Sequence, residues 1–72
     1  MIRIQDILDT IASYYPEADF ALVQKAYVFA ASAHAGQTRL SGEPYLSHPL
    51  EVAYTLATLR LDEASIVAGL LH

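Results

Sequence analysis

Apolar residues recur at helical spacing in four blocks of this chain, and Pro, Gly or Asp residues separate the blocks. Steps of three and four residues place the apolar side chains of each block on one face of an α-helix. The pattern predicts helices over residues 4–14, 20–35, 49–60 and 63–72. No block alternates apolar and polar residues as a half-buried strand does. The sequence therefore predicts an all-α fold, a four-helix part of a helical bundle.

The ends of these helices are marked by residues with capping preferences. Asp19 and Asp62 stand where the N-caps of the second and fourth helices belong, because a short oxygen-bearing side chain accepts hydrogen bonds from the free amides there. Gly36 follows the second helix as its left-handed C-terminal residue. Ser47 or His48 is expected to cap the third helix, with Pro in its first turn. The predicted apolar stripe of the second helix comprises Leu22, Val23, Ala26, Phe29, Ala30 and Ala33.

The composition is unusually apolar for so short a chain. Apolar residues make up 54% and charged residues 17% of its 72 positions, whereas a small free-standing domain needs more charge to cover its surface. Residues 66–72 also continue an apolar helical pattern without a C-terminal capping signal. We therefore expect residues 1–72 to be the N-terminal, incomplete part of a larger domain, whose remainder or an oligomeric partner covers the apolar surface. The alternative is a short protein with a buried terminal helix.

Several classes of protein are excluded by the sequence. It contains no cysteine, which excludes disulfides and thiolate metal ligands. The N-terminal residues show no basic region followed by an apolar core, as a secretory signal would, and no apolar run reaches the roughly 20 residues that span a bilayer. The net charge of −4 argues against DNA and other nucleic acids as partners. We expect a cytoplasmic protein that binds neither membrane nor DNA.

Two of the three histidines are expected to meet at one end of a helical hairpin. A turn of only a few residues joins the third and fourth helices, so they should pack antiparallel. Their lengths, about 18 and 15 Å at 1.5 Å per residue, place the start of one beside the end of the other. His48 is at that start and His72 at that end. Imidazole is a common metal ligand, but a catalytic site needs three protein ligands, so further ligands would have to come from residues after His72.

The loop between the second and third helices carries a more specific pattern. It reads Arg-Leu-Ser-Gly-Glu-Pro-Tyr over residues 39–45, and His-Pro follows at residues 48–49. Together with Ala-His-Ala-Gly-Gln at residues 33–37, Ala-Gly-Leu-Leu-His at residues 68–72 and the interval between the last two histidines, this pattern resembles the hydrolase domain of RelA/SpoT homologues. In that family the final His is followed by Asp, which forms the His-Asp pair that names the HD superfamily.

The resemblance implies an HD-domain-like helical bundle of the stringent response, which hydrolyses the 3′-pyrophosphate of guanosine tetra- or pentaphosphate, (p)ppGpp, with a manganese-activated water. It assigns His48 and His72 as two metal ligands. It assigns Arg39 to packing against the guanine base, which suits a planar guanidinium, and Ser41 and Gly42 to the loop that lines the nucleotide pocket. The third ligand and the catalytic residues of the family lie after His72, so this chain alone is expected to be inactive. In bifunctional members of the family the protein also carries a synthetase domain.

Other interpretations of the same residues remain open. Arg39 also fits a solvated loop charge, and residues 41–44 also fit a plain turn on backbone grounds. His34, near the end of the second helix, fits a structural role better than a ligand. The competing functions are hydrolysis of another nucleotide within the superfamily, or a non-catalytic helical regulatory or interaction module. The loop that carries Arg39 weighs against another nucleotide, because a superfamily member that hydrolyses a different nucleotide does not need an arginine packed against guanine.

Overall fold

The chain folds into four α-helices in a computed structural model that describes residues 1–72. The helices are α1 (Ile4–Tyr14), α2 (Phe20–Ala33), α3 (Ser47–Thr58) and α4 (Glu63–Leu71). The only β pairing is an isolated antiparallel bridge between Thr38 and Pro44, in the loop between α2 and α3. The all-α prediction is confirmed. None of the helices combines the length and the apolar character needed to cross a membrane.

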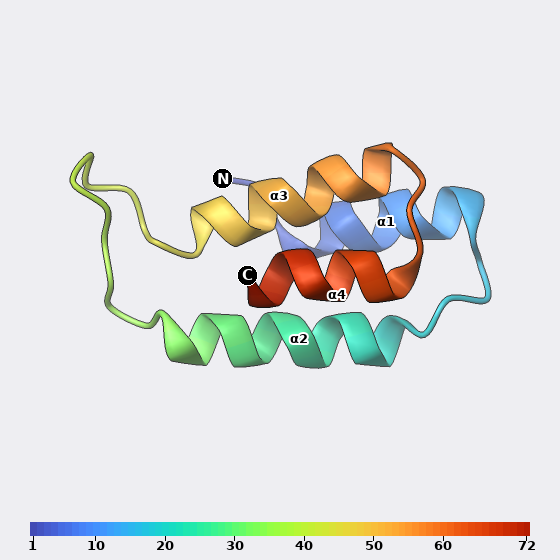
Figure 1. The fold of residues 1–72 in the computed structure, drawn as a ribbon, viewed down its shortest axis with the longest axis horizontal. Helices are drawn as coiled ribbons and strands as arrows, with labels where there is room; N and C mark the ends of the chain where they lie inside the picture. Colours follow the sequence, from blue (N-terminus) through green and yellow to red (C-terminus); the bar gives the residue numbers. More distant parts are fainter.

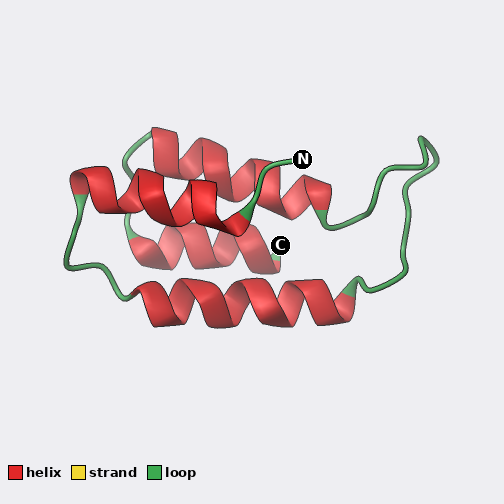
Figure 2. Cartoon of the chain, turned by 180° about the vertical axis from the view of Figure 1, so that it is seen from behind, coloured by secondary structure: helices red, strands yellow, loops and turns green.

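Helix α4 lies between α3 and α2 and packs against both, while α1 packs against α3 and α2 (Figure 1). The short turn after α3 makes α3 and α4 antiparallel, which is also visible from behind (Figure 2). The molecule is elongated, with extents of 37 × 19 × 17 Å, and the loop between α2 and α3 projects beyond the helices at one end (Figure 1). The end of α2, the start of α3 and the end of α4 therefore face the same end of the molecule.

The hydrophobic core is a single cluster to which all four helices contribute. Eleven buried residues form it, and partly buried residues such as Tyr54 pack against them. Leu50 from α3 and Leu70 from α4 are 1% and 0% exposed, so the two helices of the hairpin share the centre of the core. The other large side chains that are fully buried are Ile7, Ile11, Ile66, Val23 and Pro49.

Helix α2 buries less of its predicted apolar stripe than the spacing indicates. Val23, Ala26 and Ala30 are buried, but Leu22 is 41% and Phe29 is 67% exposed. The reason is that α2 is apolar around most of its circumference, whereas α4 and α1 contact it only from the side of the bundle. Its remaining apolar side chains lie on a side that no helix of this chain covers.

The two predicted aspartate caps are confirmed. Asp19 accepts a hydrogen bond from the Leu22 amide at 3.0 Å, and Asp62 accepts one from the Ser65 amide at 2.9 Å. Hydrogen bonds from the side chain and then the backbone of Ser65 hold the pKa of Asp62 below its ordinary value. Each aspartate therefore satisfies an amide that has no partner inside its helix.

The ends of α2 and α3 that border the loop differ from the prediction. Helix α3 begins at Ser47, with Leu46 as N-cap and no side-chain cap, so neither Ser47 nor His48 caps it. The Ser47 amide is already bonded to the Pro44 carbonyl at 3.1 Å, and this preceding turn starts the helix early. Helix α2 ends at residue 33 rather than 35, because the chain turns directly after it. Gly36 adopts the expected left-handed conformation in that turn, with φ of 75°.

Tyr14 links the end of α1 to the turn between α3 and α4. Its hydroxyl donates a hydrogen bond to the Leu61 carbonyl at 2.6 Å, and burial, with a smaller effect of the Asp62 charge, raises the pKa of Tyr14. Tyr14→Phe leaves that carbonyl without its partner, so we expect the free energy of unfolding, measured by urea denaturation, to fall by about 1 kcal/mol. Tyr15→Phe is the matched control, since Tyr15 is 38% exposed and makes no such link. Equal midpoints for the two variants would contradict a stabilising role of the bond.

Candidate functional site

His48 and His72 meet at one end of the α3–α4 hairpin. His48 lies in the first turn of α3, and His72 is the C-cap of α4. Their ring centroids are 6.3 Å apart, with an angle of 52° between the ring planes. The convergence of the two imidazoles that the helix lengths predict is therefore confirmed.

Gly69 allows α4 to approach α3 closely beside these histidines. A Cβ atom at this position would lie 2.9 Å from Cδ1 of Leu56, 3.4 Å from Cγ1 of Val52 and 3.5 Å from Cα of Ala53. A glycine costs the helix some stability by itself, but here it leaves room for the side chains of α3. A side chain at this position would require Leu56 to move and would crowd the α3–α4 contact.

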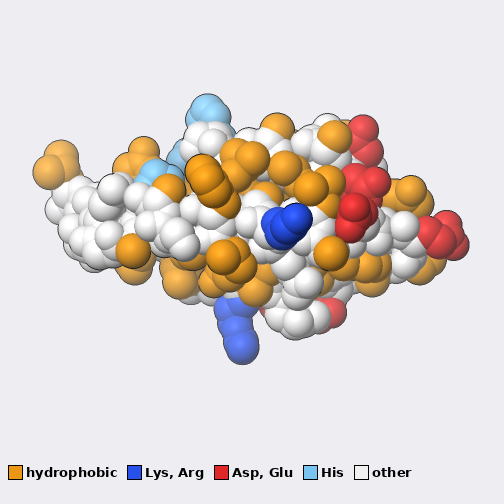
Figure 3. Space-filling view, turned by 90° about the horizontal axis from the view of Figure 1, so that it is seen from below, with side chains coloured by type: hydrophobic (Ala, Val, Ile, Leu, Met, Phe, Trp, Pro, Cys, Tyr) orange, Lys and Arg blue, Asp and Glu red, His pale blue; other side chains and the backbone are white.

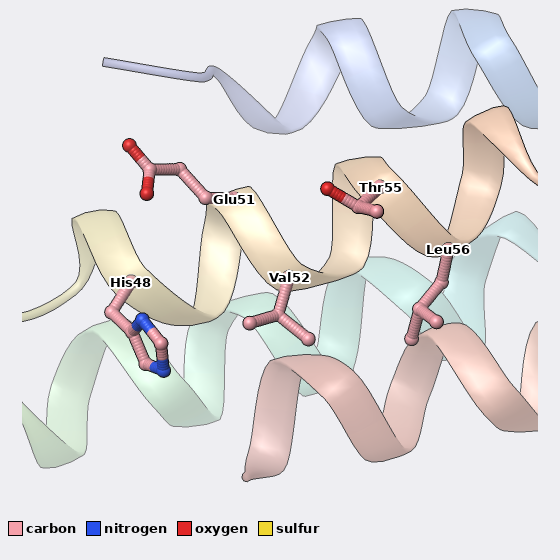
Figure 4. A pocket seen from close by; sticks show the side chains of 5 residues that line it. All are labelled: His48, Glu51, Val52, Thr55 and Leu56. Carbon is pink, nitrogen blue, oxygen red and sulfur yellow. The ribbon is translucent and has the colours of Figure 1, made fainter.

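The two imidazoles have the chemistry of metal ligands. In zinc enzymes, for comparison, ring nitrogens bind the ion at about 2.0–2.1 Å, and a catalytic ion takes three protein ligands with one position left open. No group of three or more His, Cys, Asp or Glu side chains in this chain is placed to hold an ion. Glu51, one turn along α3, lines a pocket together with His48, but its carboxylate points away from the His48 ring (Figure 4). The pair therefore fits two ligands of a site that needs further donors.

The loop between α2 and α3 forms a hairpin that carries the predicted substrate-binding residues. The Arg39 amide donates to the Glu43 carbonyl and the Gly42 amide donates to the Arg39 carbonyl, both at 2.8 Å, which closes a tight turn. Gly42 has φ of 89°, a conformation that glycine adopts without steric cost. Ser41 and Gly42 are exposed in this turn, and neither lines a pocket with the histidines.

Two pockets meet at His48. One has a volume of about 260 Å³ and follows α3 (Figure 4), where it is lined by His48, Glu51, Val52, Thr55 and Leu56. The other, of about 220 Å³, is lined by Arg39, Tyr45 and His48. The structure thus brings Arg39 into the same pocket as one of the two predicted metal ligands. A guanidinium beside aromatic rings suits a planar or anionic ligand.

Tyr45 also lines the Arg39 pocket, a role that the sequence pattern did not indicate. Its ring stacks on His34, with centroids 4.5 Å apart and an angle of 27° between the planes. His34 is the C-cap of α2, in keeping with the structural role expected for it. The sequence did contain a signal for this role of Tyr45, which is its position three residues before His48. In the structure the His48 amide donates a hydrogen bond to the Tyr45 carbonyl at 3.2 Å. Residues three apart in a helical turn share a side of it.

One group of acidic side chains lies at the end of the molecule away from the histidines, whereas Glu43 and Glu51 lie at the histidine end. Figure 3 shows Asp and Glu side chains grouped toward one end of this face and His side chains toward the other. Asp62 and Glu63 begin α4 at the acidic end, where the Glu63 carboxylate accepts a hydrogen bond from the Asp19 amide. An anionic ligand at the histidine end is therefore held away from this acidic group, although the net charge of the chain is −4.

Comparison with known proteins gives the following relatives. The sequence profile of the HD domain family matches residues 26–72. A GTP pyrophosphokinase of Myxococcus xanthus is 60% identical over 63 residues, which are 88% of this chain and 8% of that protein. The bifunctional (p)ppGpp synthase/hydrolase SpoT of Escherichia coli strain K12 and a guanosine-3′,5′-bis(diphosphate) 3′-pyrophosphohydrolase of Escherichia coli O157:H7 are both 43% identical over 72 residues, which are 100% of this chain and 10% of each relative. The chain thus spans about a tenth of the length of these relatives.

Proposed function

This chain belongs to the HD domain family, in its RelA/SpoT branch, and on that basis we propose that it forms part of a domain that hydrolyses the 3′-pyrophosphate of (p)ppGpp. In this proposal residues 1–72 are the N-terminal part of the domain, and the other metal ligands and the catalytic residues lie in its remainder. A synthetase domain belongs to the same cytoplasmic protein. The support is that relatives similar over this whole chain carry the names of a (p)ppGpp synthase/hydrolase and of a 3′-pyrophosphohydrolase.

The observation that carries the proposal is that His48 lies close to both His72 and Arg39. Its ring centroid is 6.3 Å from that of His72, and its side chain shares a pocket with Arg39. The phosphates of a nucleotide whose base contacts Arg39 would therefore be within reach of the two imidazoles. Hydrolysis of a specific nucleotide needs both a group that recognises the base and groups that act on the phosphates.

Proteins of the HD domain family bind divalent metal ions, and the ion proposed here is manganese, with His48 and His72 as two of its ligands. Such an ion would supply Lewis-acid chemistry, offsetting phosphate charge and lowering the pKa of an attacking water. Each histidine would bind the ion through the lone pair of a ring nitrogen. Ser41 and Gly42 are proposed to contact the nucleotide because they belong to the same hairpin as Arg39. The chain alone is expected to be inactive, because two ligands do not complete the site.

The function is tested by incubating the complete protein with guanosine tetraphosphate and manganese and measuring the pyrophosphate released. We expect Arg39→Ala to lower kcat/KM by about tenfold and to reduce the preference for guanosine over adenosine substrates, because a desolvated stacking or cation–π contact is lost. Arg39→Lys is expected to be nearly as harmful, since a point-charge ammonium cannot replace a planar guanidinium. Lys25→Ala removes an exposed positive charge from α2 and is the control, with activity within about twofold of wild type.

The Arg39 variants separate three roles for this side chain. Full activity of Arg39→Lys with a strong loss in Arg39→Ala would indicate a charge that attracts phosphate and would refute the base contact. Activity of both variants within about twofold of wild type would identify Arg39 as a solvated loop charge. Absence of pyrophosphate release by the unmodified complete protein would refute the proposed function itself.

A further inference from the structure

The stack between His34 and Tyr45 fixes one wall of the Arg39 pocket. Gln37 makes three hydrogen bonds that tie the residues around this stack together. Its Oε1 lies 3.1 Å from Nδ1 of His34, its carbonyl accepts a hydrogen bond from the Tyr45 amide at 3.0 Å, and its Nε2 donates to the Ala33 carbonyl at 3.2 Å. The Tyr45 ring is therefore held against the end of α2, although Tyr45 lies only two residues before the start of α3.

The stack leaves part of the Tyr45 ring available to a ligand. Tyr45 is 40% exposed although His34 covers one of its faces, and it lines the pocket together with Arg39 and His48. Every nucleobase has a π-face that stacks on aromatic side chains, and a guanidinium stacks on planar groups in the same way. A phenol ring and a guanidinium in one pocket are therefore suited to holding a base. No carboxylate lines this pocket to repel the phosphates of the same nucleotide.

We propose that Tyr45 is a second base-contacting residue, which forms the nucleotide pocket together with Arg39, and that His34 is the positioning residue that holds the Tyr45 ring in place. The proposal rests on the function proposed above and specifies which part of the nucleotide this pocket binds. The ligand class is a purine nucleotide whose base lies between the hairpin loop and the start of α3. His34 acts through Tyr45 and does not itself touch the ligand.

The test is isothermal titration of the complete protein with guanosine tetraphosphate and separately with inorganic pyrophosphate, both without manganese so that the tetraphosphate is bound and not hydrolysed. We expect Tyr45→Ala to weaken binding of the tetraphosphate by about tenfold, in line with the loss of one base–aromatic stack, and to leave binding of pyrophosphate unchanged. Tyr45→Phe keeps the ring and should bind as the wild type does. His34→Ala should weaken tetraphosphate binding by about threefold through loss of the stacked pair, and His34→Phe should restore it.

Tyr15→Ala is the matched control, because Tyr15 is 38% exposed, close to the value for Tyr45, and lies at the end of α1 outside both pockets. Unchanged tetraphosphate binding in Tyr45→Ala would overturn the proposal. Equal losses for tetraphosphate and pyrophosphate would also overturn it, since they would show a general distortion of the site. Failure of the unmodified protein to hydrolyse a tetraphosphate that it binds would refute only the proposed function, and the affinities would still decide the role of Tyr45.

Discussion

We expect replacement of Leu70 by Ala to lower the free energy of unfolding of this chain by about 2–5 kcal/mol. Leu70 is 0% exposed and belongs to α4, the helix that packs against both α2 and α3. Truncation removes apolar contacts with both neighbours and leaves a cavity, because the surrounding helices relax only in part. A complete native protein is stable by only about 5–15 kcal/mol, so a loss of this size is a large share of the total.

The adjacent Leu71 gives a matched control for this substitution. It is the next residue of the same helix and is 50% exposed, so Leu71→Ala deletes the same atoms without opening a cavity in the core. Urea denaturation followed by circular dichroism measures both variants, and we expect the Leu71→Ala midpoint to stay close to that of the wild type. Equal losses in the two variants would mean that α4 does not occupy the centre of the core.

The features that depend on local sequence were predictable. The helical spacing of apolar residues gave α1 its correct bounds of residues 4–14, and Asp19 and Asp62 cap the two helices expected of them. The approach of His48 and His72 was also predictable, because two helices of known length joined by a short turn leave one arrangement for their ends. These inferences needed no knowledge of long-range contacts.

The features that depend on neighbours in space were not predictable from spacing. Helix α2 is apolar on most of its surface, so its sequence does not distinguish the covered side from the side on which Phe29 is 67% exposed. The stack of His34 on Tyr45 joins residues from the two ends of the loop, and only the path of the loop brings their rings to 4.5 Å. Ser41 and Gly42 share the hairpin with Arg39, but the lining of the Arg39 pocket comes from Tyr45 and His48 instead.

In the complete protein, His48→Ala and His72→Ala should each reduce hydrolysis of the 3′-pyrophosphate to less than about a hundredth of the wild-type rate. Changes to residues that only support metal ligands already cost about 10–100-fold in metal affinity or activity, and each of these variants removes a ligand itself. Manganese content measured by atomic absorption should fall in parallel, while any synthetase activity of the protein stays measurable. Thr58→Ala, at the far and exposed end of α3, is the control that should retain hydrolysis.

The double variant tests whether the two histidines serve one ion. Their ring centroids are 6.3 Å apart, and the proposal above places one ion between them. If both side chains bind the same ion, either single substitution already disables the site, and the double variant should be no slower than the slower single variant, because the effects of residues that act as a unit do not add. If the two histidines act independently, their losses should multiply instead. Hydrolysis near the wild-type rate in either single variant, at matched manganese, would remove that residue from the site.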